Sequence, residues 1–282
     1  MLKEFPTKQA AHDFAVARPN FIFARDVHEK GAKRYIACDL DTFIETYLIM
    51  RKSSRMHYEV IPDDIPLKLY FDVEFERADH PLWCEDAIVQ RIVDSVRLET
   101  KIPNLVLFQL DASNEKKASR HLIFPLVFPN KPNMKLFVNH LIEVLRSSAS
   151  PITAKGTVCG IDPSVYDHDR CFRLYGSHKM GHIARTFYPI LAGCKVELDS
   201  LDPTLFRQLL ISYIDHDVFL PRYTHVQVAA PENKKKRNYS AVGTTTRLRI
   251  HENETIESIR LWLKTTYPEY TQAEAQGRPN GP

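Results

Sequence analysis

The chain has 282 residues, of which 44% are hydrophobic and 26% charged, enough to bury a core of one large or two small domains. No apolar run approaches the roughly 18 residues of a membrane span, and the N-terminus lacks the apolar segment of a secretory signal, so we expect an intracellular protein with no membrane partner. A net charge of +3 is too mild to indicate a nucleic-acid binder by itself, and five scattered cysteines favour neither a disulfide framework nor a zinc ribbon. The sequence contains no glycine-rich phosphate loop, so any phosphate would be bound by side chains.

The N-terminal part of the chain predicts a small α/β module over residues 1–60. Its helices and strands follow from the apolar spacing and from the acids and bases at the ends of the second helix. The expected elements are a helix over 7–17, strands over 20–26 and 33–39, and a helix over 39–52.

The middle of the chain, residues 61–228, predicts an α+β core. The expected elements are strands over 67–75, 104–111 and 119–128, the last two forming a hairpin, helices over 85–100, 133–148 and 203–214, and strands over 170–177 and 182–191. Residues 229–248 predict a basic linker, and residues 249–282 a final amphipathic helix and tail.

Two acids, Asp72 and Glu74, interrupt the apolar strand LKLYFDVEF. Because side chains alternate along a strand, both lie on one face, with their Cα atoms roughly 7 Å apart. That spacing lets two carboxylates converge on one or two divalent cations. An isolated pair of this kind is more often the solvated face of an ordinary sheet.

A second strand carries Lys117, Ser119 and His121 at alternate positions, again on one face. An amine, a hydroxyl and an imidazole form a poor core but a good set of donors to phosphate oxygens. Taken alone, the pattern is weak, since His121 is also compatible with an ordinary histidine at a strand edge.

A third segment, GIDPSVYDHDRCFRLYGSHKMG, adds a further carboxylate, Asp162, and three cations, Arg170, Arg173 and Lys179. Without the other two motifs it would be interpreted as a surface loop and a strand with solvated charges. The basic run near the C-terminus is either part of a solvated linker or an element that contacts DNA backbone or an import receptor; it comprises Lys234, Lys235, Lys236 and Arg237.

The ordered set YEVIP…KLYFDVEF, KASRHLIF and IDPSVYDHDRCFRLYGSHK resembles the signature of the primase-polymerase (PrimPol) family of the archaeo-eukaryotic primase superfamily. The resemblance covers about residues 5–180. It implies a catalytic core with an RRM-like mixed or antiparallel sheet beside the small N-terminal module.

The resemblance also implies roles for individual residues. Asp72, Glu74 and Asp162 correspond to the catalytic acids that hold Mn²⁺ or Mg²⁺. The residues that correspond to nucleotide-binding positions are Arg34, Lys117, Ser119, His121, Arg173 and Lys179, while Arg170 and residues 234–237 are candidates for nucleic-acid contacts.

The implied function is template-dependent nucleotidyl transfer, as a DNA primase, a DNA polymerase or both, in damage-tolerant replication. Its partners would be single-stranded DNA template, primer–template and nucleoside triphosphates, with replication proteins as further candidates. The compartment would be the nucleus or the mitochondrion if the host is a eukaryote, and the sequence does not distinguish a cellular from a viral origin. The family's C-terminal Cys/His zinc module has no counterpart in this sequence, so we expect primer extension more than primer initiation. A metal-dependent nuclease and a nucleic-acid-binding domain without catalysis remain as alternatives.

Overall fold

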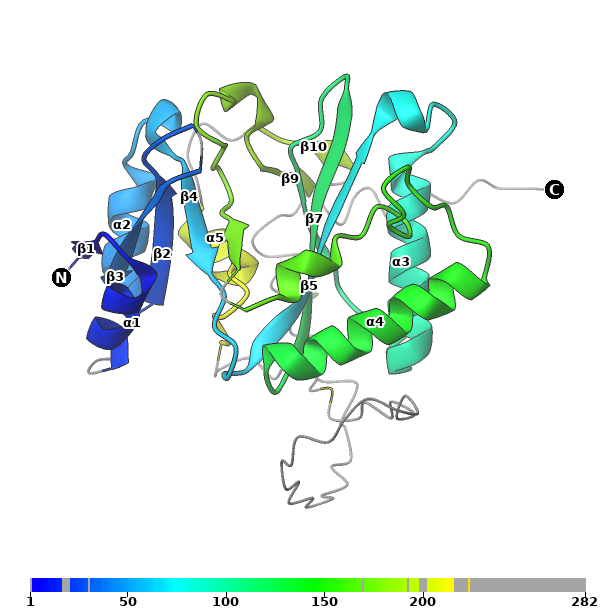
Figure 1. The fold of residues 1–282 in the computed structure, drawn as a ribbon, viewed down its shortest axis with the longest axis horizontal. Helices are drawn as coiled ribbons and strands as arrows, with labels where there is room; N and C mark the ends of the chain where they lie inside the picture. The colour runs from blue at the N-terminus through cyan, green and yellow to red at the C-terminus, as the bar shows by residue number, and fades with distance from the viewer. Residues whose placement is uncertain are drawn as a thin grey trace, which may run out of the picture.

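A computed structural model describes residues 2–16, 21–29, 31–168, 170–191, 193–197, 202–215 and 223. The described chain forms two five-stranded sheets whose neighbouring strands are antiparallel, with helices packed against both sheets (Figure 1). The expected α+β class is confirmed. Within these residues, no helix has the length and apolarity that crossing a membrane requires. The predicted linker and final helix, including residues 234–237, lie outside the described residues.

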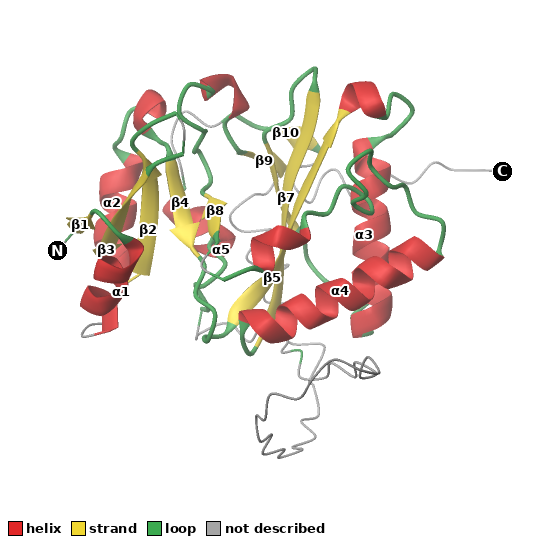
Figure 2. Ribbon diagram, viewed as in Figure 1, coloured by secondary structure: helices red, strands yellow, loops and turns green. Residues whose placement is uncertain are grey.

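The first sheet is formed mainly by N-terminal residues. Its strands lie in the order β1 (Lys3–Phe5), β3 (Lys33–Cys38), β2 (Phe21–Asp26), β4 (His57–Val60) and β8 (Cys171–Arg173). Helices α1 (Lys8–Val16) and α2 (Leu40–Leu48) pack on opposite faces of this sheet, since Phe14 of α1 contacts Phe5 and Phe43 of α2 stacks on Phe23, which the register places on the other face. Figure 2 shows both helices beside this sheet. Because β8 pairs with β4, a strand from much later in the chain completes the sheet.

The second sheet carries the acidic strand at one edge. Its strands lie in the order β10 (Cys194–Lys195), β9 (Tyr188–Leu191), β6 (Phe108–Asp111), β7 (Lys117–Phe128) and β5 (Leu67–Glu76). Helices α3 (Glu85–Thr100) and α4 (Lys131–Ser147) pack on its outer side, while α5 (Pro203–Leu209) lies toward the first sheet (Figures 1 and 2). The described residues also contain four 3₁₀ turns: η1 (Lys52–Ser54), η2 (Arg77–Asp79), η3 (Pro163–Tyr166) and η4 (Ile183–Arg185).

Local sequence accounts for the helices that were predicted well. Asp39 caps α2 by accepting a hydrogen bond from the Thr42 amide at 2.8 Å, and Asn130 caps α4 from the Asn133 amide at 2.9 Å. Two acids in the first turn of α3 complement the helix dipole, and its apolar stripe faces the core. The predicted range 85–100 for α3 is confirmed.

Several predicted ranges were wrong in extent. The helix expected over 203–214 ends at Leu209, because the buried carboxylate of Glu59 accepts hydrogen bonds from the amides of Ile211 and Ser212, both at 2.7 Å. The strand expected over 170–177 has only three residues, and the one expected over 182–191 begins as the turn η4. The sequence analysis did not predict β1, β4 or β10.

Residues 160–167, here called the β5 strap, lie along the free edge of β5. The Glu74 amide donates to the Gly160 carbonyl at 2.8 Å, and the Asp162 amide donates to the Asp72 carbonyl at 2.9 Å. The Tyr70 hydroxyl donates to the Val165 carbonyl at 2.9 Å. These bonds place the distant Asp162 beside the acidic pair.

The buried ammonium of Lys131, at the start of α4, fixes the far end of the β5 strap. It donates to the Ile61 carbonyl at 2.9 Å and to the Asp167 carbonyl at 3.2 Å, and it pairs with Asp63 at 2.5 Å. One cation therefore joins the entrance to β5, the end of the strap and α4.

Gly160 is the position where the β5 strap has least room. Its φ is +70°, and a Cβ there would lie 3.1 Å from the Glu74 carbonyl oxygen and 3.2 Å from Phe75 Cδ1. We expect Gly160→Ala to lower the free energy of unfolding by about 2 to 4 kcal/mol, because left-handed backbone and crowding against β5 both oppose it. Chemical denaturation measures this loss.

Gly156→Ala is the matched control, because Gly156 has a φ of +81° with nothing within 4 Å of the added carbon. We expect it to cost only the backbone contribution, about 1 to 2 kcal/mol. Equal losses in the two variants would contradict the close approach of the strap to β5.

Candidate functional site

The two acids of β5 face the donors of β7 across the antiparallel register. Asp72 lies opposite His121, Glu74 opposite Ser119, and Glu76 opposite Lys117. Directly paired residues share a face of a sheet, so acids and donors lie side by side on the surface that faces β8. This register supports the sequence analysis, which placed each set on one face of its own strand.

Asp162 joins this surface through the β5 strap. Its amide bonds to the Asp72 backbone, and its side chain accepts a hydrogen bond from the Ser164 amide at 2.8 Å, which caps η3. Three carboxylates from two distant parts of the sequence are thereby neighbours.

The carboxyl group of Asp72 is strongly perturbed by its surroundings. Its Oδ1 is buried and has no hydrogen-bond partner among the described residues. Burial, helped by the charges of Glu74 and Asp162 and opposed by Arg173 and Lys117, raises the pKa of Asp72 from 3.8 to about 7. A positive charge placed beside Oδ1 would therefore be stabilised.

Three cations surround the acids. Lys117 forms an ion pair with Glu74 and lies 3.7 Å from a Glu76 oxygen. Arg185, from η4, places Nη2 3.8 Å from the second Glu74 oxygen. The guanidinium of Arg173 lies 5.1 Å from the Phe187 ring centroid, and its buried Nε has no partner among the described residues.

His121 is held between two aromatic rings. Its ring centroid lies 3.8 Å from that of Phe172 and 3.7 Å from that of Phe187, both nearly parallel. Burial and the nearby charge of Arg173 hold the pKa of His121 well below its ordinary value, so the imidazole is neutral at neutral pH. Its buried Nδ1 has no partner among the described residues.

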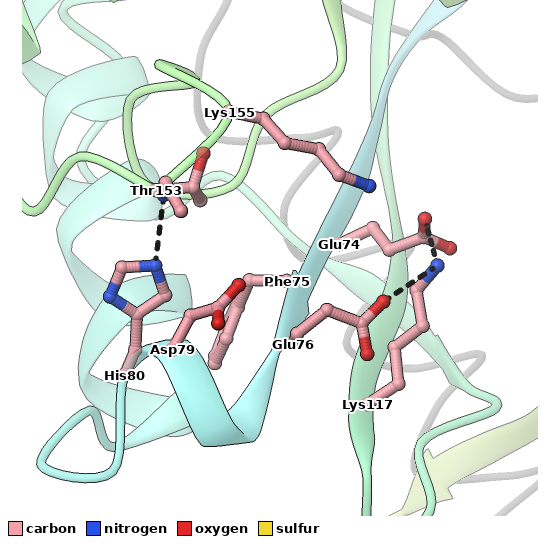
Figure 3. Close-up of a pocket in the computed structure, with 9 residues that line it drawn as sticks. Glu74, Phe75, Glu76, Asp79, His80, Lys117, Thr153 and Lys155 are labelled. Carbon is pink, nitrogen blue, oxygen red and sulfur yellow. Dashed lines mark hydrogen bonds and ion pairs between the residues drawn. The ribbon is translucent and has the colours of Figure 1, made fainter.

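A pocket of about 260 Å³ opens beside Glu74 (Figure 3). Glu76, Asp79 and Lys117 contribute charges to its wall, and the His80 ring accepts a hydrogen bond from the Ala154 amide at 3.2 Å. A larger hollow of about 1270 Å³, beside Asp41 and Arg207, contains none of the predicted site residues. Chemistry rather than size therefore identifies the candidate site.

The other predicted residues are not all brought to this surface. The register pairs Arg34 with Arg25 and Arg25 with His57, whereas Arg173 pairs with Tyr58, so Arg34 lies on the opposite face of the first sheet from Arg173. Arg170 is exposed and lies 3.5 Å from Asp167. Lys179 is exposed in the loop that follows β8.

The sequence analysis missed Arg185. Its segment was expected to be a strand, and no local pattern distinguishes this arginine from a solvated one. Only the turn η4, which directs it back toward β5, brings it to Glu74.

The carboxylate oxygens of Asp72, Glu74 and Asp162 are of the chemical type that binds a divalent cation. Carboxylate oxygens are the ligands that Mg²⁺ and Mn²⁺ prefer, and the unpartnered Oδ1 of Asp72 lacks a positive neighbour in contact. In the described residues, however, no three His, Cys, Asp or Glu side chains converge as a ready metal-binding group. Glu74 would first have to leave its ion pairs.

Comparisons with known proteins found relatives that share parts of this chain. A DNA-directed primase/polymerase protein of Gallus gallus is 30% identical over 164 residues, which cover 53% of this chain and 27% of that protein. The Mus musculus protein of the same name is 37% identical over 106 residues, 34% of this chain and 20% of that protein. A putative primase of ostreid herpesvirus 1 is 29% identical over 188 residues, 57% of this chain and 16% of that protein.

No family model matches the chain. The aligned part spans little more than a quarter of the length of these relatives, or less. The similarities nevertheless agree with the three motifs, each of which contributes at least one side chain to the same surface. The chain is therefore similar, over about half of its length, to curated proteins named DNA-directed primase/polymerase or primase, and these similarities support the resemblance to the primase-polymerase (PrimPol) family.

Proposed function

We propose that the chain catalyses template-dependent nucleotidyl transfer: it extends a primer on a single-stranded DNA template with nucleoside triphosphates. The observation that carries this proposal is that Asp72, Glu74 and Asp162 share one surface with side chains that can donate hydrogen bonds to phosphate oxygens. The names of the relatives, primase/polymerase and primase, agree with it. The proposal includes the RRM-like primase arrangement for the core and a role in damage-tolerant replication with other replication proteins.

The three acids are the proposed ligands of Mn²⁺ or Mg²⁺. Bound there, two cations would lower the pKa of the primer 3′-hydroxyl and stabilise the pyrophosphate leaving group. The chain's own part is to present oxygen ligands from the rigid β5 and its strap, so that little reorganisation is needed at the moment of transfer.

The cations of the site are the proposed ligands of the triphosphate. Lys117 and Arg173 can each form charge-assisted hydrogen bonds to phosphate oxygens, and neutral His121 can donate one N–H without adding charge. We propose supporting roles for Ser119 and Lys179 in the same site. We propose that Arg34 helps to hold nucleotide and template from the first sheet, and that Arg170 and residues 234–237 contact DNA backbone.

One assay distinguishes the proposal from its alternatives. With Mn²⁺, nucleoside triphosphates and a labelled primer on a template, a polymerase lengthens the primer. A metal-dependent nuclease would shorten it, and a binding domain without catalysis would only retard it in a gel. Shortening, or binding without extension, would overturn the proposal.

We expect Asp72→Asn and Glu74→Gln each to reduce primer extension by about a thousandfold or more, because a metal ligand acting on transition-state charge is lost. Glu76→Gln is the control, since Glu76 lies on the same strand face and near the same lysine but is not a proposed ligand. We expect it to retain activity within a few-fold. Equal losses in Glu74→Gln and Glu76→Gln would contradict the assignment of ligands.

The raised pKa of Asp72 predicts how metal-free stability depends on pH. The unfolded chain loses this proton near pH 4 and the folded chain near pH 7. The stability that Asp72 contributes is therefore fully present below about pH 4 and is lost as the pH rises to about 7. Asp72→Asn removes this titration. With a chelator present to keep the protein free of metal, the variant should therefore be more stable than the wild type, by on the order of 2 kcal/mol at pH 8.

Denaturation at several pH values measures the difference between the two proteins. It should grow between pH 4 and 7 and stay constant above, as the cited pKa values require. Adding Mn²⁺ at pH 8 should stabilise the wild type and leave Asp72→Asn nearly unchanged. A difference that is the same at every pH would show that folding does not raise the pKa of Asp72.

A further inference from the structure

Glu74 is held by two cations from different parts of the chain. Lys117 of β7 pairs with one of its oxygens, and Arg185 of η4 lies 3.8 Å from the other. The Arg185 side chain is only 23% exposed, and its buried Nε has no hydrogen-bond partner among the described residues. A largely desolvated guanidinium with an unused donor has capacity for an additional anionic ligand.

The backbone around Arg185 is well fixed. The Arg185 amide donates to the His182 carbonyl at 2.9 Å, and the Thr186 hydroxyl to the Ile183 carbonyl at 2.7 Å. Two residues further on, Phe187 exchanges backbone hydrogen bonds with Gly176 and Ser177 and stacks on His121. The backbone that carries Arg185 is thereby anchored through Phe187, which packs on the imidazole that the proposed function assigns to the triphosphate.

These contacts conflict with metal binding by Glu74. A carboxylate whose two oxygens each face a cation has to release at least one of them before it can bind a divalent ion. Once Glu74 binds the metal, Arg185 and Lys117 would have lost the carboxylate that they pair with. Both positive side chains would then lie close to the positive metal ion, which is unfavourable. A polyphosphate brought in with the metal supplies the anion that both cations then lack.

We propose that Arg185 is a nucleotide-binding residue that exchanges partners: it neutralises Glu74 in the absence of ligands and binds the polyphosphate when Glu74 turns to the metal. This inference rests on the proposed function. It predicts opposite effects of Arg185 on the two ligands, since the arginine competes with metal for Glu74 but attracts nucleotide. An arginine that only supports the fold would affect both in the same direction.

The test compares Arg185→Gln with Arg207→Gln. Arg207 is also an ion-paired arginine, 2.6 Å from Asp41 of α2, so its replacement removes the same charge away from the acids. Free Mn²⁺, followed by electron paramagnetic resonance, reports metal binding without nucleotide. Calorimetry with Ca²⁺, a nucleoside triphosphate and a primer–template whose primer lacks a 3′-hydroxyl reports nucleotide binding without turnover.

We expect Arg185→Gln to bind Mn²⁺ alone about two- to fivefold more tightly and the nucleoside triphosphate about tenfold more weakly. Arg207→Gln should leave both affinities unchanged. Arg185→Lys, which keeps the charge but not the planar guanidinium, should restore wild-type Mn²⁺ affinity and recover only part of the nucleotide affinity. If the glutamine variant does not fold, Arg185→Lys takes its place as the test of the nucleotide contact.

If Arg185→Gln weakens the binding of both Mn²⁺ and nucleotide, or of neither, the inference is overturned and the proposed function is left intact. If the glutamine variant does not fold, Arg185→Lys with wild-type affinity for nucleotide would overturn it. A wild-type chain that binds no nucleotide with primer–template would overturn the proposed function itself, and the role of Arg185 with it.

Discussion

The backbone pairing between β5 and its strap is the constraint on which the candidate site depends. β5 is an edge strand, so without a neighbour its outer N–H and C=O groups would be unpaired. The strap supplies bonds to Asp72 and Glu74, and it does so with the residues that carry Asp162. The pairing that protects the sheet edge is therefore also what gathers the three acids, and a shift of the strap by one residue would turn Asp162 away from them.

The charges of the site are arranged for ligands more than for stability. Burial, helped by repulsion from the neighbouring carboxylates, raises the pKa of Asp72 to about 7. Lys117 and Arg185 offset the charge of Glu74, but partly buried ion pairs contribute little net stability, because desolvation opposes the attraction. Local conflict of this kind is expected where a site is built to bind cations and phosphates.

Local patterns predicted the elements that depend on local physics. The stripe of α3, the caps of α2 and α4, and the alternation of β5 and β7 are all determined by nearby residues, and these elements are confirmed. The end of α5 is determined by Glu59, more than 140 residues away in sequence, so periodicity extended the helix too far. The same limit applies to Arg185 and Arg34, whose positions depend on a turn and on strand register.

The predicted boundary at residue 60 cuts through a unit that the strand pairing holds together. Arg173 lies on β8, whose only strand partner among the described residues is β4, and Tyr58 of β4 is its register partner. The aromatic neighbour of His121 in that strand, Phe172, is aligned by the same pairing with Glu59. β4 is in turn paired with β2, and α2 packs against these strands in the core. The N-terminal residues therefore position Phe172 and Arg173, two side chains of the candidate site. The first 60 residues are thus part of the scaffold that places Phe172 and Arg173 at the candidate site, although they contain none of the acids themselves.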